Sequence, residues 1–432
     1  MKYILFALVF FVSYSICAMP IDSITADTSR MSSDVLKKHF DLKEGEEFSE
    51  QKYDQAKQDL EKLGVFRTLE FVYKEKKDGV DIHIKADDRT YIIPMLFGLS
   101  GNKHSFGASV EARNLFKQAE SASLFVGGGR DGFDTHGSLI LDKHSFYMGY
   151  EHINFDQRFY NNGWTSNKNI FSSADDKNKY TESLQGEVHG RQDDFYVTYL
   201  YQISNLWNVS ITPQYEYYEY QNHMLDSGKH SHLSVGIGYT DGVSAGMNMD
   251  RLTGVEYKYK ADILQDFTRL KTGKLAEIFY TTGGKWTGSD YDISKISLSG
   301  VYLLEFKMRH ALAFFAKAER AFTAPFSNEV ESSDLLFGLG IYDREQRGKN
   351  GVSGGISFSY YLMRNEKGLL SVTPFYEQAY ISSGGHAYQP HSGIGATMAY
   401  RWWRIPLPIS LNFTHNLNDG NQHVGCKVGG KF

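Results

Sequence analysis

Three short segments of this sequence combine residue types and spacings that carry out chemistry in other proteins. Residues 127–132 match the pattern G-x-G-x-x-G, in which glycines let the backbone approach a dinucleotide phosphate closely. Residues 351–355 match G-x-S-x-G, the pattern around a nucleophilic serine, which here is Ser353. His230 and His232 are separated by one residue, and imidazole is a common metal ligand. Cofactor binding, acyl transfer and metal binding are therefore the first functions to consider.

The elements expected around these segments do not suit that chemistry. A dinucleotide loop joins a strand to a helix, whereas Asp131-Gly132 predicts a turn between two strands. Ser353 opens an alternating strand, although a nucleophile elbow needs a strand, a turn and a helix. His230 and His232, expected at a loop tip, have no third ligand nearby in the sequence. We therefore predict no catalytic, cofactor-binding or metal-binding residue, and a protein that is not an enzyme.

Composition indicates the kind of fold that the chain must build. Among 432 residues there are 29 Tyr, 29 Phe, 5 Trp and 41 Gly, but only 8 Pro. Transmembrane barrels carry aromatic girdles at both membrane interfaces, which suits this bias. A secreted soluble β-sandwich rich in tyrosine would have a similar composition, so composition alone leaves both folds open. The net charge of −5 is small for this length and argues against nucleic-acid binding.

Residues 1–18 have the pattern of a secretory signal peptide. Lys2 gives a positive start, residues 4–12 form an unbroken apolar run, and Ala18 is a small residue suited to cleavage. Lipidation of Cys17 is an alternative, although the bulky residue before it suits lipoprotein processing poorly. No later run of 18 apolar residues occurs, which argues against helical membrane spans but not against a barrel, because barrel strands alternate.

Residues 19–88 are charged and partly helical, and they predict a small domain. A first strand is expected over residues 21–26. Ser32 or Ser33 can begin a short helix that runs to about Phe40. Ser49 can cap a second helix, with Phe48 and Tyr53 placed as a hydrophobic staple.

The second helix and the strands after it complete this domain. Tyr53, Ala56, Leu60 and Leu63 fall on one helix face, and Gly64 ends the helix. Two alternating strands follow, joined by the hairpin signal Asp78-Gly79. The predicted order is β-α-α-β-β.

From residue 89 to residue 432, the pattern changes to alternation with a period of two. Residues 105–112, 232–240 and 423–432 each place apolar side chains on one face and small or polar ones on the other. Such strands suit a wall between lipid and a wet lumen. Turn signals punctuate the region at Asp131-Gly132, Asp241-Gly242, Asn350-Gly351 and Asp419-Gly420. The length predicts a mainly β protein, a transmembrane antiparallel barrel of about 16 strands.

Five short segments resemble motifs of one known family. They are Leu63-Gly64-Val65-Phe66 within residues 60–88, Arg113-Asn114-Leu115-Phe116, Gln346-Arg347-Gly348, Phe375-Tyr376-Glu377, and the terminal Phe432. In that order they resemble the BamA/TamA-like outer-membrane assembly and translocation superfamily, also called surface antigen D15 proteins. The resemblance implies a single POTRA domain over residues 19–88, in the periplasm, whose core includes Leu60, Leu63, Gly64 and Phe66. It also implies a barrel over residues 89–432 and an assembly signal at Phe432.

The resemblance further implies a contact between a long loop and a barrel strand. Arg347 would lie on a loop folded into the lumen and pair with Glu377, which shares the lumen face of its strand with Phe375. Gly348 would permit a backbone turn that a β-carbon forbids. The chain departs from the family in Lys349, where an aromatic residue is usual, in Glu377, where aspartate is usual, and in having one POTRA domain.

Two functions follow from this resemblance. The first is a non-enzymatic factor of the bacterial outer membrane that inserts barrel proteins or translocates a polypeptide. Its partners would be an unfolded outer-membrane or secreted polypeptide, the lipid bilayer, and possible periplasmic proteins that bind the POTRA domain, but not nucleic acid. The alternative is a porin-like or structural barrel whose POTRA domain docks a periplasmic partner.

Overall fold

The computed structural model describes most of the chain from Met19 onward. The described residues are 19–428 without 41, 63–64, 101–104, 130–131, 142, 161–163, 168–183, 205, 222–224, 242–272, 307–309, 337–344, 366–367, 383–388, 403–404, 419 and 421. The predicted signal peptide over residues 1–18 therefore lies outside the described residues, as do Leu63, Gly64 and Phe432.

The chain divides into two compact units. The first comprises Met1–Tyr91 together with Arg113–Glu120, and the second comprises Ile92–Ala112 together with Ser121–Phe432. The sequence prediction of a boundary near residue 88 did not anticipate that the segment Arg113–Glu120 packs with the first unit.

The first unit is a three-stranded sheet covered by two helices. Its elements are β1 (Ile21–Thr28), α2 (Ser33–His39), α3 (Glu50–Lys62), β2 (Phe66–Glu75) and β3 (Val80–Asp88). The strand order is β1-β3-β2, with β1 parallel and β2 antiparallel to the central strand. Within the described part of the chain, no helix is long and apolar enough to cross a membrane.

Local signals in the sequence account for these elements. Ser32 caps α2 by accepting a hydrogen bond from the N–H of Val35, and the rings of Phe48 and Tyr53 lie 5.8 Å apart as a staple at the start of α3. Leu60 is fully buried on the predicted face of α3. Phe66 is partly buried and packs against the same core.

The second unit is a barrel of 16 long strands, which confirms the predicted fold class. Its sheet has 20 strands among the described residues, and four of these are short. The long strands are β4 (Tyr91–Ser100), β5 (Ser105–Arg113), β6 (Ser121–Gly129), β7 (Gly132–Leu141), β8 (His144–Tyr160), β10 (Leu184–Gln202), β11 (Trp207–Tyr220), β13 (His232–Asp241), β14 (Gly273–Gly283), β15 (Ile293–Phe306), β16 (His310–Thr323), β19 (Asn350–Asn365), β20 (Gly368–Ser382), β21 (Gln389–Trp402), β22 (Ile405–Asn416) and β23 (Gln422–Val428). The short strands are β9 (Trp164–Asn167), β12 (Gly228–Lys229), β17 (Val330–Glu331) and β18 (Glu345–Gly348).

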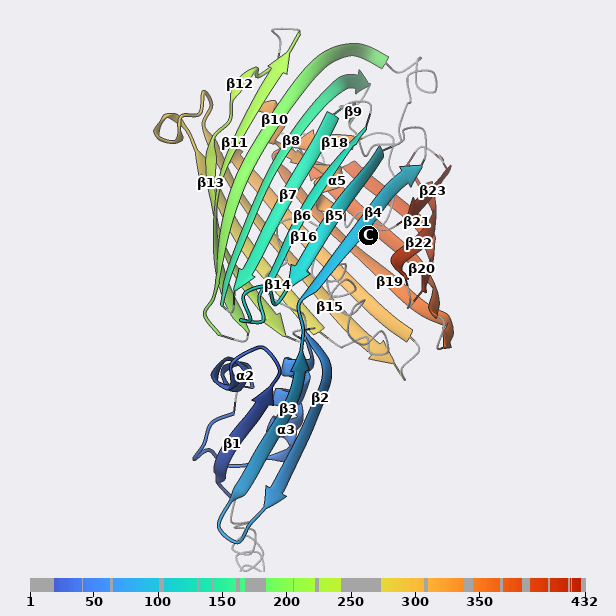
Figure 1. Cartoon of the computed structure of the whole chain (residues 1–432). Coiled ribbons are helices and arrows are strands. Elements are labelled where there is room, and N and C mark those ends of the chain that lie inside the picture. The colour runs from blue at the N-terminus through green and yellow to red at the C-terminus, as the bar shows by residue number, and fades with distance from the viewer. Residues whose placement is uncertain are drawn as a thin grey trace, which may run out of the picture. The chain divides into compact units, whose positions relative to one another are not determined.

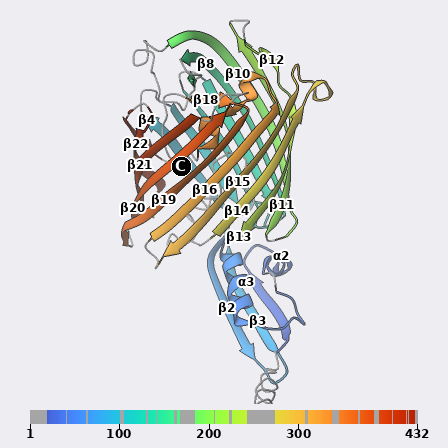
Figure 2. The same ribbon diagram turned by 180° about the vertical axis from the view of Figure 1, so that it is seen from behind.

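Neighbouring long strands are antiparallel wherever their register is described. Figure 1 shows β4 to β8 side by side on one wall, and Figure 2 shows β13 to β16 beside β19 to β22 on the other. The first and last barrel strands meet, because β23 pairs with β4 at Cys426, Lys427 and Val428. Among the described residues, this seam has three paired positions, whereas β22 and β23 share seven.

Side chains alternate between the two faces of the barrel wall. On β11, Trp207, Ile211 and Tyr215 are exposed on the outer face, while Ser210 and Thr212 are buried on the inner face. An apolar outer face and a polar inner face suit a wall between lipid and lumen.

One predicted turn is wrong. Asn350-Gly351 begins β19, with Asn350 opposite Arg320 of β16, instead of joining two strands. The backbone of Lys349 already bonds to both neighbours, since its N–H donates to Ser382 and its carbonyl accepts from Ala321. The chain therefore enters the sheet before the Asn-Gly pair.

Candidate functional site

The long connection between β16 and β19, residues 324–349, contains its own small elements. These are η4 (Phe326–Asn328), β17, α5 (Ser332–Leu335) and β18. Strands β17 and β18 are antiparallel, with Glu331 opposite Arg347 and Val330 opposite Gly348. Strand β18 also pairs with β9. The register therefore brings the Arg347 and Glu331 side chains together from positions 16 residues apart.

The guanidinium of Arg347 is the centre of this connection. Its side chain is only 7% exposed, and Nη2 donates to Oε2 of Glu331 at 2.8 Å. Nη1 donates to the carbonyls of Phe326 and Ser327 at 3.2 and 3.1 Å. The guanidinium carbon also lies 5.1 Å from the centre of the Phe326 ring. A planar fork of donors suits this combination of carboxylate, carbonyls and aromatic face better than an ammonium group would.

The loop is fastened to one part of the wall through η4. Asn328 donates from Nδ2 to Oε2 of Glu216 on β11 at 2.7 Å. Its Oδ1 lies 2.6 Å from Nδ1 of His230, and the hydroxyl of Ser327 lies 3.0 Å from the same nitrogen. His230 is fully buried and lies just before β13, so it belongs to this anchor and not to the loop tip where the sequence placed it.

A second anchor joins the loop to β19, β20 and β21. The Ser332 hydroxyl lies 2.8 Å from Nδ1 of His391 and accepts a hydrogen bond from the N–H of Gln346. The Ser353 hydroxyl donates to the carbonyl of Leu335 at 2.6 Å. Apolar contacts reinforce the anchor through a buried cluster of Ala321, Val330, Leu335, Leu336, Ala379 and Ile381. The loop is therefore bound to two separate stretches of the barrel wall.

Gly348 serves the loop by close approach and not by an unusual backbone turn. Its φ is not among the positive values, so the predicted reason for this glycine is wrong. A β-carbon at this position would lie 2.6 Å from the carbonyl oxygen of Ser382 on β20. The same holds for Gly351, where a β-carbon would lie 2.3 Å from Cδ1 of Leu335. Both glycines let the loop press against the wall.

The strand that was expected to receive Arg347 lies beside the second anchor. Phe375 and Glu377 on β20 are buried, whereas Tyr376 and Tyr380 are exposed on the opposite face. The Phe375–Glu377 face is therefore the inner one, which it shares with Ala379 of the loop-binding cluster. Pairing of Arg347 with Glu377 stays a prediction, and the contact described above for Arg347 is with Glu331.

A row of carboxylates on the inner wall was not anticipated from the sequence. In the register of β7, β8, β10 and β11, each of its members directly faces the next, in the order Asp134, Glu151, Asp194 and Glu216. Like charges that face each other are unfavourable. The amide of Gln214 offsets part of this repulsion, because it donates to both Asp194 and Glu216 at 3.0 Å. His136 lies 2.8 Å from Asp134 at the other end. All four lie at inward-facing positions of alternating strands. This shared position is the sequence signal that could have predicted the row.

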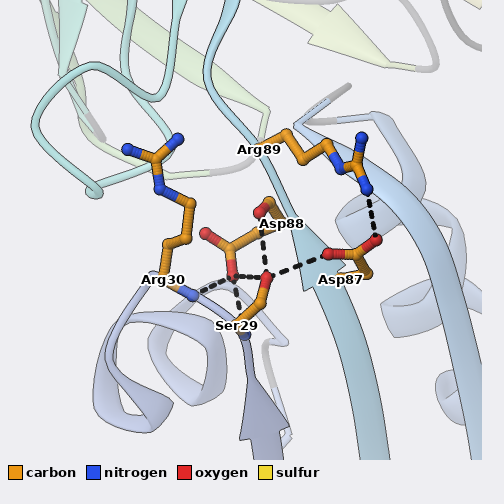
Figure 3. Close-up of polar contacts among 5 residues, drawn as sticks. All are labelled: Ser29, Arg30, Asp87, Asp88 and Arg89. Atoms are coloured by element: carbon orange, nitrogen blue, oxygen red, sulfur yellow. Dashed lines mark hydrogen bonds and ion pairs between the residues drawn. The ribbon is translucent and has the colours of Figure 1, made fainter.

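In the first unit, the carboxylate of Asp88 is a second centre of polar contacts (Figure 3). It accepts hydrogen bonds from the N–H groups of Ser29, Arg30 and Met31 at 2.9–3.1 Å. The side chain of Asn114, in the segment resembling the asparagine-leucine-phenylalanine turn, donates to it at 3.1 Å. Burial alone would raise the pKa of Asp88, but these hydrogen bonds outweigh it and lower that pKa.

Asn114 has a backbone conformation that suits its role. Its φ is +56°, in the left-handed region that asparagine tolerates better than most residues. The residue is fully buried, and its Oδ1 accepts from the N–H of Ala119 at 3.2 Å. Its N–H donates to the carbonyl of Glu120, so the turn closes on itself. The asparagine of this motif is thus a structural residue of the first unit.

The remaining motifs are parts of strands. Gly127, Gly128 and Gly129 lie in β6 and Gly132 lies in β7, where Gly129 and Gly132 face each other across two antiparallel strands. Ser353 lies within β19, opposite Ala379, and its hydroxyl is engaged with the loop. Both segments thus have a strand context instead of the strand-to-helix context that their usual chemistry needs.

The first unit matches a known protein family. Residues 21–88 match the POTRA family, described as a surface antigen variable number repeat. This match confirms the single POTRA domain predicted ahead of the barrel. A search of curated proteins finds no match to the sequence.

Solved structures of other proteins are similar to this chain over nearly its whole length. BamA from Haemophilus ducreyi lacking POTRA domains 1-3 is similar over 96% of this chain and 84% of its own, with 14% identity and a TM-score of 0.51. CdiB from Escherichia coli is similar over 95% and 76%, with 13% identity and a TM-score of 0.63. CdiB from Acinetobacter baumannii is similar over 95% and 74%, with 10% identity and a TM-score of 0.55. At these identities the likeness is one of fold.

Proposed function

Because the chain joins one POTRA domain to a barrel with the fold of BamA and CdiB, as the BamA/TamA-like superfamily does, we propose that it is a non-enzymatic outer-membrane factor that inserts barrel proteins or translocates a polypeptide. Its client is an unfolded polypeptide that reaches the barrel from the periplasm. The lipid bilayer surrounds the apolar outer face, and the POTRA domain lies in the periplasm.

The observation that carries this proposal is the loop 324–349 bound to two stretches of the inner wall. Asn328 holds it to Glu216 on β11, and Ser332 holds it to His391 on β21. Six long strands, β13 to β16, β19 and β20, separate β11 from β21 in the sheet order, so the loop reaches across a large arc of the barrel. A lumen crossed by a fastened loop is poorly suited to passive flow of solutes, which supports a role in handling polypeptides.

The edge of the POTRA sheet supports client binding. Among the described residues, β2 pairs only with β3, and its other edge is open. The opposite edge, on β1, is partly occupied, since Ile21 exchanges hydrogen bonds with Gly45 and Glu46. An unfolded segment can add to an open edge by backbone pairing, with little demand on its sequence. Val72 on β2 is 60% exposed and offers an apolar contact to such a segment.

The seam between β4 and β23 supports passage toward the bilayer. Among the described residues, three positions pair there, against ten between β13 and β14, and this difference supports the proposal that the seam opens more readily than other strand pairs. Gly425, in β23, contributes no side chain to hold a neighbouring strand. A client strand could therefore pair at this seam at low cost.

A porin-like barrel with a docking POTRA domain is the second candidate, and the row Asp134, Glu151, Asp194 and Glu216 favours it. Such a row on the inner wall would attract cations.

Depletion of the protein from cells separates the two functions. We expect other barrel proteins or a surface polypeptide to fall in quantitative proteomics of the outer membrane. Unchanged membrane proteins together with slower cation uptake would instead establish the porin-like function.

A further inference from the structure

The outer faces of β8 and β10 change character along their length. Near the start of β8, Phe146 and Met148 are exposed, and on β10 Phe195 is exposed. From Phe195 back toward the start of β10, the next outward side chains, at positions 193, 191, 189 and 187, are all polar or charged. These strands have 17 and 19 residues, more than the roughly 9–11 that cross a bilayer, so their polar ends lie beyond the apolar belt.

Three potential metal ligands meet on this polar part of the outer face. Asp156 on β8 is directly opposite His189 on β10, and Glu187 lies two residues from His189 on the same face. One ligand atom from each residue lies within 4.8 Å of the other two. The closest approach is 2.5 Å between Nδ1 of His189 and Oδ1 of Asp156.

The neighbouring Arg158 holds one of these ligands in place. It is opposite Glu187 in the register, and its Nε lies 3.6 Å from Oε2 of that carboxylate. The Arg158 side chain is only 4% exposed, whereas the imidazole of His189 is 56% exposed. Carboxylates that bind metals are commonly held by such outer partners, which orient them. The ligand set therefore combines a fixed carboxylate with an accessible imidazole.

A pocket gives access to the same place. It has a volume of about 440 Å³, and Asn154, Asp156, His189 and Arg191 are among the residues that line it. Its size is sufficient for several water molecules beside the ligand atoms. Water could therefore complete the coordination of an ion at this position.

A second cluster on the same face contains a single carboxylate. Asp193 accepts hydrogen bonds from the hydroxyl of Tyr150 at 2.8 Å and from Arg191, and Nδ1 of His152 lies 2.7 Å away. One carboxylate is there surrounded by three donor groups. At Asp156 and Glu187, two carboxylates instead converge on one imidazole.

We propose that Asp156, Glu187 and His189 bind a divalent transition-metal ion of the zinc class on the outer face of the barrel. One imidazole nitrogen and two carboxylate oxygens, with water in the remaining positions, are a ligand set that Zn²⁺ accepts and that Ca²⁺ and Mg²⁺, which prefer oxygen ligands alone, do not favour. The site is independent of the function proposed above.

Zinc binding to the folded, detergent-solubilised protein tests this proposal. Competition with a chromophoric zinc indicator should show one site that weakens on the order of 10-fold or more in His189→Ala and in Glu187→Gln. The matched control is His152→Ala, which removes a histidine from the same face but not from the ligand set. Heat-modifiability on gels shows that each variant is folded.

A second readout distinguishes ligation from a general change of charge. Co²⁺ bound to the protein should give visible absorption bands in the wild type and in His152→Ala, but not in His189→Ala. Arg158→Lys, which keeps the charge but changes its position beside Glu187, should keep the bands and weaken Co²⁺ binding. The proposal is overturned if His189→Ala binds Zn²⁺ as the wild type does, or if His152→Ala removes the site equally.

Discussion

Replacement of Arg347 by alanine should release the loop 324–349 from the barrel wall. The change removes the ion pair with Glu331, two hydrogen bonds to the carbonyls of Phe326 and Ser327, and the contact with the Phe326 ring. Breaking a buried ion pair costs about 3–5 kcal/mol. The side chains of this pair keep some exposure, 7% and 14%, so we expect a cost of roughly 2–4 kcal/mol for local opening of the loop.

Limited proteolysis of the folded barrel measures this cost. At about 1.4 kcal/mol per factor of ten, cleavage within the loop should become roughly 30- to 700-fold faster in Arg347→Ala. The cleavage rate of Arg347→Lys should lie between those of the wild type and Arg347→Ala, because an ammonium group keeps the charge but loses the planar fork. The control is Arg320→Ala on β16, whose exposed guanidinium stacks on Phe322 and has no part in the loop.

Double-mutant cycles then assign the partner of Arg347. We expect coupling of about 1–3 kcal/mol between Arg347→Ala and Glu331→Gln, because their side chains are in contact. The predicted pair with Glu377 requires coupling in the cycle with Glu377→Gln as well. If Arg347→Ala and Arg320→Ala accelerate cleavage equally, the argument that Arg347 fastens the loop is refuted.

Three further predictions concern the close packing of the loop, the core of the POTRA domain and the carboxylate of Asp88. Gly348→Ala should speed cleavage of the loop, because the new methyl group would lie 2.6 Å from a carbonyl oxygen, whereas Gly186→Ala has open space and should have no effect in the same assay. Leu60→Ala should lower the free energy of unfolding of the POTRA domain by about 2–5 kcal/mol in denaturant titration, while Val72→Ala at an exposed position should change it little. Since the pKa of Asp88 is lower in the folded domain than its ordinary value of 3.8, the stabilisation is present above that pH and is lost as the pH falls through the folded value. Hydrogen exchange in β1 and β3 should therefore accelerate on acidification, and Asp88→Asn should remove that dependence; an unchanged pH profile would contradict the role of this carboxylate.

The regular parts of both units could be predicted because their signals are local. Alternation predicted a strand over residues 232–240, and β13 spans His232–Asp241. Serine caps and a staple predicted the two helices of the POTRA domain, since these signals depend on neighbours within one turn. The predicted number of strands was reached by dividing the length of the barrel region by about 21 residues per strand and connection, because a strand needs about 9–11 residues to cross a bilayer.

The contacts of the loop could not be predicted in the same way. Strands β17 and β18 pair at two positions, too few to leave a periodic signal, so the register that sets Arg347 opposite Glu331 was invisible. Gly348 was expected to permit a backbone turn that a β-carbon forbids, but its neighbour across space, the carbonyl of Ser382, decides its role. Such close approaches depend on tertiary packing and are not encoded in sequence spacing.

The metal-ligand cluster was missed for a related reason. Asp156 and His189 are 33 residues apart, and only the pairing of β8 with β10 brings them together. The sequence instead drew attention to His230 and His232, which are close in the chain. In the structure His230 is buried against the loop, so spacing along a strand was a poor guide to ligation.

The central claim, that this barrel handles unfolded polypeptides, is tested most directly by reconstitution into lipid vesicles. An unfolded outer-membrane barrel protein is added, and its folded, heat-modifiable form is followed over time with a photo-crosslinker placed at Val72 on β2 or, as a control, at the exposed Asp27 on β1. The account predicts faster folding or uptake of the client than in empty vesicles, with crosslinks from Val72 and few from Asp27. A client that folds at the same rate in empty vesicles and crosslinks equally to both positions would contradict it.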